Sequence, residues 1–206
     1  MADEASLDHE RFIGSDPAAP PTLAGVPPQQ FTRPVLEFFA RMEGPVVFER
    51  GGTRFNLPPI MAHNLPLGNA WLDYNSFLSS DKIELPVTLR EIAILRIAWH
   101  MRAGYEWYQH RIIGRRCGLS DEQLNAVRIG AGADIWSEQE RLAILAADEI
   151  NAHDRITRET FQRMIEAFGP RKLLELMWTI GTYGMLAWIN NSFEVPIEDF
   201  ALKDAG

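Results

Sequence analysis

VTLREIAILRIAWHMRAGYEWYQH, residues 87–110, is the stretch that decides the fold. Thr88 followed three residues later by Glu91 has the pattern of a capping box, in which side chains satisfy the free amides of a helix N-terminus. From Ile92 to Trp99 the residues are apolar almost all the way round a helix. Such a helix belongs at the centre of a bundle or between subunits, because each of its faces must be hidden from water. We predict that it ends before Gly104, where the chain breaks.

A second helix is expected after this break, and it carries a carboxylate and an imidazole on one face. Glu106 and His110 are four residues apart, and Ile113 and Cys117 continue the same stripe. The apolar members indicate that the stripe faces inward, where each ionisable group shifts the pKa of the other. The pair is therefore a candidate acid/base device. The alternative is a satisfied polar pair in the core or at a subunit contact.

The rest of the chain also predicts helices, and no segment alternates as a strand does. Ser120 with Gln123 and Ser137 with Glu140 are further capping-box patterns. The expected helices span about 34–43, 58–63, 66–78, 121–130, 138–151 and 157–168, with a long apolar helix after 170. Residues 44–57 are expected to form a loop. We predict an all-α helical bundle that is oligomeric, because the apolar surfaces of 92–99 and of the last helix exceed what one small bundle can hide.

Residues 1–33 are set apart by composition. Five prolines lie among small and polar residues there, which disfavours helix and sheet alike. We expect an extended arm that is either disordered or wrapped around a neighbouring subunit. Residues 34–206 then form a single helical domain.

Charge and cysteine content exclude several classes of protein. A formal net charge of −8 without any basic run argues against a nucleic-acid partner. The single cysteine fits a reducing compartment. No apolar run reaches the length of a membrane span, and the acidic N-terminus does not have the pattern of a signal peptide. We expect a cytoplasmic protein with no membrane partner, whose partners are a small-molecule substrate and copies of itself.

Three segments in order resemble the carboxymuconolactone decarboxylase family of the alkylhydroperoxidase D-like superfamily. These are ELPVTLREIAILRIA at 84–98, Tyr-Glu-Trp with His110 at 105–110, and Gly-Leu-Ser at 118–120. The resemblance runs from about 66 to 202 and is densest at 84–125. It implies an all-helical fold, assembly into trimers or hexamers, and an active site near subunit contacts.

The thiol-using branch of that superfamily has the pattern Glu-x11-Cys-x2-Cys-x3-His. Counted from Glu91, its two cysteine positions hold Ala103 and Glu106, and its histidine position holds His110. Peroxide reduction needs one thiol to react and a second to resolve the sulfenic acid, so peroxidase activity is not expected. Cys117 lies seven residues beyond His110 and is interpreted as a small core residue.

The sequence is instead similar to the thiol-free branch, whose namesake reaction is decarboxylation of a small lactone acid. Loss of carbon dioxide next to a carbonyl leaves an enolate, which then needs a proton at a defined carbon. His110 is predicted to move that proton, with Glu106 holding the imidazole and raising its pKa. Glu91 is either the family's catalytic carboxylate or only a helix cap. The prediction is a cofactor-free lyase without a metal; isomerisation, dehydration, retro-aldol cleavage and a non-catalytic ligand-binding oligomer remain alternatives.

Other side chains are weaker candidates for substrate binding. Arg96 is a candidate for holding a substrate carboxylate, and the alternative is an ordinary ion pair with a structural carboxylate. His63 is a further candidate, with a simple surface position as the alternative. The aromatic residues could line a pocket for a ring-shaped substrate, as in aromatic compound breakdown, or could fill the core: Trp99, Tyr105, Trp107 and Tyr183.

Overall fold

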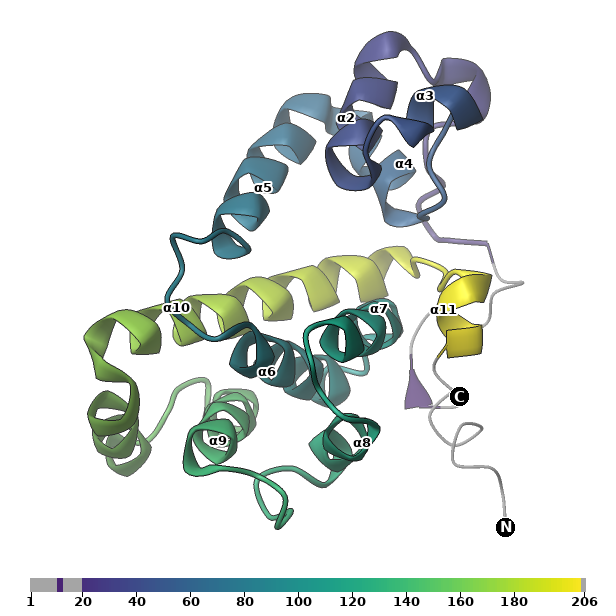
Figure 1. Ribbon diagram of the computed structural model, residues 1–206. Helices are drawn as coiled ribbons and strands as arrows, with labels where there is room; N and C mark the ends of the chain where they lie inside the picture. The colour runs from purple at the N-terminus through teal and green to yellow at the C-terminus, as the bar shows by residue number, and fades with distance from the viewer. Residues whose placement is uncertain (1–10, 13–19, 205–206) are drawn as a thin grey trace, which may run out of the picture.

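The computed structural model describes residues 11–12 and 20–204, and these contain helices and no strands (Figure 1). The prediction of an all-α fold is therefore confirmed for this part of the chain. None of the described helices has the length and apolar character needed to cross a membrane. The helices are η1 (Pro28–Gln30), α2 (Arg33–Glu43), α3 (Val46–Arg50), α4 (Leu57–Met61), η2 (Ala62–Asn64), α5 (Leu65–Leu78), α6 (Val87–His100), α7 (Gly104–Arg116), α8 (Asp121–Ile129), α9 (Glu138–His153), α10 (Arg158–Phe193) and α11 (Asp199–Asp204).

Helix α6 is the centre of the bundle and packs against α7, α8, α9 and α10 (Figure 1). Its apolar residues divide between two cores: Ile92 and Leu95 belong to the core beside α7 and α8, and Ile94 and Ile97 to the core beside α9 and α10. The central position predicted for this helix is confirmed. The exposed apolar surface predicted for 92–99 was one argument for oligomerisation. It does not apply to residues 92–98, because the chain itself buries them.

Helix ends agree with most of the sequence signals. Both side-chain bonds of a capping box are present at Ser120 and at Ser137. Gly104 begins α7, and the left-handed residue Gly118 (φ 101°) follows the end of that helix. The capping box predicted at Thr88 is wrong: α6 begins at Val87 after Pro86, without a side-chain cap. Glu91 is thereby available for another contact.

The last long helix contains the break that the sequence predicts between 168 and 170. Gly169 has a left-handed, non-helical backbone (φ 69°, ψ 171°), so α10 consists of two helical pieces. Pro170 begins the second piece, where a proline at the first turn loses no helix hydrogen bond. That piece runs along the bundle and contributes residues to the site described below (Figure 1).

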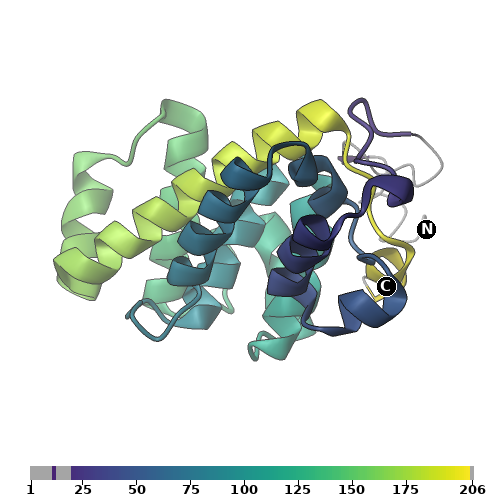
Figure 2. The same ribbon diagram turned by 90° about the horizontal axis from the view of Figure 1, so that it is seen from above.

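Helices α2–α5 form a separate layer that covers part of the bundle in the view from above (Figure 2). Phe38, Phe39 and Leu72 supply its own small core. The predicted loop at 44–57 is corrected, because Val46–Arg50 forms α3 and Leu57 already belongs to α4. Glycines on either side of α3 had obscured this short helix.

The proline-rich arm is described only in part. Residues 20–32 lie against the chain itself: Thr22 N donates to Phe193 O at 2.9 Å, and Val26 N donates to Pro59 O at 3.0 Å. Phe12 is buried among Trp99, Trp107 and Tyr108. Residues 1–10 and 13–19 lie outside the described part, so contact of the arm with a neighbouring subunit stays a prediction.

Candidate active site

A pocket of about 270 Å³ lies where the α2–α5 layer meets the bundle. This volume is slightly below the range of typical ligand pockets, which is roughly 300–1,000 Å³, so the pocket suits a small molecule. The layer supplies apolar and aromatic walls together with Asn75 and Ser79, and the bundle supplies the ionisable groups of the lining. The lining residues are Met42, Phe55, Leu57, Pro58, Trp71, Asn75, Ser79, Arg90, Glu91, Tyr105, Glu106, Gln109, His110, Ile113, Tyr183 and Leu186.

His110 lies between two carboxylates in this pocket. Its Nδ1 is 2.6 Å from Glu91 Oε2, and its Nε2 is 3.7 Å from Glu106 Oε2. The sequence had indicated Glu106 as the residue that holds the imidazole. The structure corrects this, because the only one of these two contacts within hydrogen-bond distance is made by Glu91. Glu91 reaches His110 from α6, across the contact between two helices.

The contact with Glu91 decides which ring nitrogen of His110 is available for chemistry. Nδ1 is engaged by the carboxylate, which fixes the orientation of the ring. Nε2 makes no hydrogen bond to another described residue and is not among the unpaired atoms closed to solvent. The arrangement resembles other carboxylate–histidine pairs, in which one nitrogen is held and the other exchanges a proton with a substrate.

Two further polar residues hold the carboxylates. Arg90 Nε donates to Glu91 Oε1 at 3.1 Å, and its Nη1 donates to Leu78 O at 3.2 Å. Asn190 Nδ2 donates to Glu106 Oε1 at 2.5 Å. Asn190 is itself buried in α10. Sequence reasoning missed both residues: Arg90 could have been noticed beside Glu91, but no local pattern connects Asn190 with a residue 84 positions earlier.

The charges around His110 favour its protonated form. Burial opposes the imidazolium, but the nearby carboxylates of Glu91 and Glu106 outweigh this effect and raise the pKa of His110. Burial also tends to raise the pKa of Glu91, yet His110 and Arg90 lower it overall. For Glu106, burial dominates and raises the pKa despite His110 and Asn190. We infer that Glu91 and His110 form an ion pair near neutral pH, and that Glu106 takes up a proton more readily than an exposed glutamate.

Helix α5 contributes two unpaired polar atoms to the residues that line the pocket. Trp71 Nε1 and Asn75 Oδ1 are closed to solvent and have no hydrogen-bond partner among the described residues. The residues are one helical turn apart and both line the pocket. Unpaired buried polar atoms reduce stability, and a bound ligand or water that pairs with them is one explanation for their presence beside a pocket. No sequence pattern distinguished either residue.

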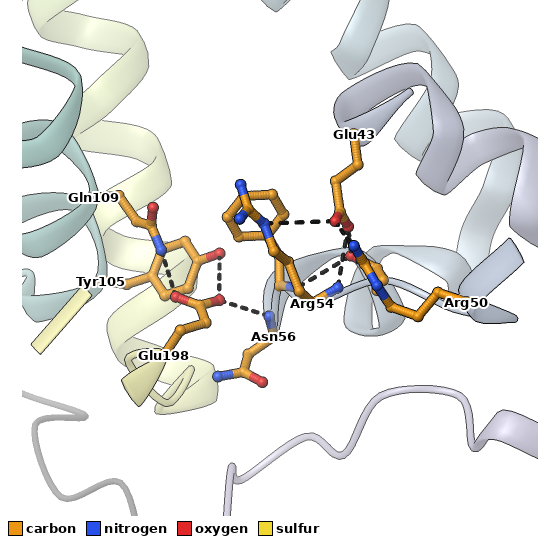
Figure 3. A network of polar contacts seen from close by, with 9 residues as sticks. Glu43, Arg50, Arg54, Asn56, Tyr105, Gln109 and Glu198 are labelled. Carbon is orange, nitrogen blue, oxygen red and sulfur yellow. Dashed lines mark hydrogen bonds and ion pairs between the residues drawn. The ribbon is translucent and has the colours of Figure 1, made fainter. Parts of the chain in front are cut away.

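Tyr105 lines the pocket as predicted, but its hydroxyl group already makes a hydrogen bond within the protein. It donates to Glu198 Oε1 at 3.2 Å, and the same carboxylate accepts bonds from Asn56 N at 2.7 Å and from Gln109 Nε2 (Figure 3). Burial raises the pKa of Glu198 although these bonds oppose the shift. Figure 3 also shows Glu43 binding Arg50 and Arg54 in the adjoining α2–α5 layer. The network links the C-terminal segment, the layer and α7 beside the pocket.

Arg96 lies outside the pocket and has a structural role. Its Nε donates to Asp148 Oδ1 at 2.5 Å, and its Nη1 donates to the carbonyl oxygens of Val127 and Arg128 at the end of α8. Gly130 follows with φ 91°, and a Cβ atom there would lie 2.5 Å from Arg96 Nη2. The expectation that Arg96 holds a substrate carboxylate is therefore corrected. The arginine among the pocket-lining residues is Arg90.

Three other predicted binding residues also lie away from the pocket. Trp107 is fully buried in the core beside α7, and Trp99 packs on it with 5.1 Å between ring centroids. The helical spacing of these tryptophans therefore reflects packing in the core and not the lining of a pocket. His63 is exposed, and its Nε2 lies 2.9 Å from Ala24 O. Among the described residues, no cluster of three His, Cys, Asp or Glu side chains is arranged as a metal site.

Solved structures share this fold at low sequence identity. The debrominase Bmp8 in its apo form has a TM-score of 0.72 and 17% identity, covering 89% of this chain and 97% of Bmp8. A cysteine-to-alanine variant of Bmp8 in complex with 2,3,4-tribromopyrrole has a TM-score of 0.73 and 18% identity, covering 89% of this chain and 94% of that one. A protein of unknown function from Agrobacterium tumefaciens, suggested to be the antioxidant defence protein AhpD, has a TM-score of 0.62 and 18% identity over 70% of this chain and 97% of its own. This protein has the AhpD-like fold. No protein-family model matches the chain, and no curated protein matches it significantly.

The single cysteine lies outside the pocket of this AhpD-like fold. Cys117 is partly buried at the end of α7, where the sequence had predicted a core position. Burial raises the pKa of its thiol, and the negative charge of Glu91 acts in the same direction. The reactive thiolate is therefore disfavoured, which is the opposite of what a catalytic cysteine requires.

Proposed function

We propose that this protein is a cofactor-free lyase in which His110 transfers a proton to a small oxygenated cyclic acid or lactone. One observation carries the proposal: Glu91 holds Nδ1 of His110 at 2.6 Å, while Nε2 has no hydrogen-bond partner among the described residues of a small pocket. A sealed and fully bonded histidine would instead support a purely structural pair. The resemblance to the thiol-free branch of the carboxymuconolactone decarboxylase family gives the reaction class.

The protonated state of His110 suits a decarboxylation. When the bond between the substrate carboxylate and its neighbouring carbon breaks, carbon dioxide leaves and the electron pair forms an enolate. Nε2–H of the imidazolium then protonates the enolate carbon, and solvent restores the proton on His110. Glu91 keeps the ring oriented through these steps. Isomerisation or retro-aldol cleavage begins with a base that removes a proton, and the two carboxylates favour the acid form over that base.

The walls of the pocket support a small, ring-shaped anion as the substrate. Arg90 offers a guanidinium group, with no partner at its Nη2 among the described residues, to a substrate carboxylate. Trp71, Phe55 and Tyr183 supply aromatic surface. The complex of Bmp8 with 2,3,4-tribromopyrrole shows that a protein of similar fold binds a planar ring. We do not propose debromination as the activity of this protein, because its single cysteine is not among the residues that line the pocket.

Assembly into a trimer or hexamer, in a cytoplasmic location, belongs to the same proposal. A row of apolar side chains on α10 supports self-association: Leu174 is 62% exposed, Trp178 58%, Met185 40% and Trp188 67%. These residues recur at helical spacing and form one stripe. Their burial against a second copy would remove a large apolar area from water.

Replacing His110 with alanine tests the proposed function. Candidate lactone acids and keto acids are assayed for release of carbon dioxide by the wild-type protein, and the variant should lower kcat on the substrate found by about 10²- to 10⁴-fold. His153→Ala, an exposed position on α9, is the matched control and should keep full activity. If folded His110→Ala turns over the substrate as fast as the wild type does, proton transfer by His110 is wrong.

A further inference from the structure

Two tyrosine side chains line the pocket, and they differ in the state of their hydroxyl groups. The hydroxyl group of Tyr105 donates to Glu198 and is committed to that network. The hydroxyl group of Tyr183, on α10, makes no hydrogen bond to another described residue. It is also not among the unpaired polar atoms closed to solvent. Tyr183 is therefore a pocket-lining residue whose hydroxyl group is free to donate a hydrogen bond.

Tyr183 lies directly against the proposed proton donor. Its ring meets the ring of His110 edge to face, with 4.8 Å between centroids and an interplanar angle of 84°. Burial raises the pKa of Tyr183, and the charges of Glu106 and Glu91 act in the same direction. The phenol thus keeps its proton, so it can donate a hydrogen bond but cannot serve as a base.

The reaction proposed above needs a donor of this kind. As the enolate forms, negative charge develops on the former carbonyl oxygen. Two carboxylates beside His110 disfavour that charge, and Nε2–H of His110 is directed to the carbon. A second group must stabilise the oxygen, and a neutral hydroxyl group in a buried site does so effectively. Trp71 Nε1 is closed to solvent, and the guanidinium group of Arg90 is assigned above to the substrate carboxylate.

We propose that the hydroxyl group of Tyr183 donates a hydrogen bond to the enolate oxygen of the substrate. This inference rests on the proposed function. The phenolic O–H bond does not break; its hydrogen bond strengthens as charge moves from the breaking carbon–carbon bond to the oxygen. The substrate must therefore carry a ketone or lactone carbonyl group directly next to the carbon that His110 protonates.

Tyr183→Phe tests the proposal, because it removes only the oxygen atom. It should lower kcat by about 10²- to 10³-fold, as the loss of one oxyanion donor does, with a much smaller change in KM. Tyr108→Phe, on α7 and outside the pocket lining, is the control and should keep wild-type kcat. A wild-type kcat in folded Tyr183→Phe, alongside a large loss in His110→Ala, would refute the role of Tyr183 and leave proton transfer by His110 intact.

A binding measurement tests Tyr183 without turnover. The anion 4-nitrophenolate is a single ring with an oxygen that resembles an enolate, and its absorbance reports the bound form. Wild-type protein and Tyr108→Phe should bind it about equally, and Tyr183→Phe should bind it at least about tenfold more weakly. Equal binding by all three proteins, or no binding to the wild type at millimolar concentration, would overturn the proposal.

Discussion

Replacing Glu91 with glutamine should lower the pKa of His110 more than replacing Glu106 does. The closest oxygen of Glu91 lies 2.6 Å from the ring and that of Glu106 lies 3.7 Å away. With an effective dielectric constant of about 20, Coulomb's law gives about 6 kcal/mol for the first pair and about 4.5 kcal/mol for the second, before the cost of desolvation. We expect a fall of about 1–3 pKa units in Glu91→Gln. Because the attraction scales inversely with distance, Glu106→Gln should cause about two thirds of that fall.

The position of Arg90 increases this difference. Arg90 Nε donates to Glu91 Oε1, so its positive charge is balanced while Glu91 is ionised. In Glu91→Gln the guanidinium charge loses that balance and disfavours the imidazolium further. Glu106→Gln keeps a carbonyl oxygen that can still accept the bond from Asn190 Nδ2. Its effect should therefore be limited to the loss of charge.

Nuclear magnetic resonance titration measures both shifts without a substrate. Long-range ¹H–¹⁵N correlations resolve the ring nitrogens of the five histidines, and His110→Ala assigns the signals of His110. Glu159→Gln, at an exposed position early in α10, is the matched control and should leave the titration of His110 unchanged. The reasoning is refuted if Glu106→Gln lowers the pKa of His110 as much as Glu91→Gln does, or if the wild-type value is not above 6.5.

Three further predictions follow from the same geometry. The contribution of His110 to stability should be full below about pH 6.5 and lost as pH rises through its raised pKa, whereas that of Glu91 should be full above about pH 4.5 and lost as pH falls through its lowered pKa. Thermal melts of wild type and His110→Ala across this range measure the window, and parallel curves would contradict it. Cys117→Ser should keep most of the turnover; loss of activity in a folded variant would contradict the thiol-free mechanism. Light scattering should give a mass that is a multiple of 23.4 kDa, with Trp178→Glu shifting it toward the monomer, and a clean wild-type monomer at micromolar concentration would contradict self-association.

The sequence by itself determined the helical architecture and singled out His110 as a candidate functional residue. Helix caps and breaks depend on local residues, so they can be predicted without knowledge of the fold. Examples are the caps at Ser120 and Ser137 and the break at Gly169. The apolar character of 92–98 required a position at the centre, and α6 occupies it. Glu106 and His110 share one helix face by simple periodicity, and both line the pocket.

Only the tertiary structure decided which groups surround His110. Glu91, Asn190 and Tyr183 come from two other helices, and no periodic pattern encodes distances between helices. The sequence assigned Arg96 to the substrate and overlooked Arg90, because both are arginines on α6 and only packing shows which one meets Asp148 and which one lines the pocket. Trp99 and Trp107 are aromatic residues of the kind that line ligand pockets, yet they pack in the core. Periodicity fixes the face of a helix on which a side chain lies, whereas the packing of neighbouring helices fixes what that face meets.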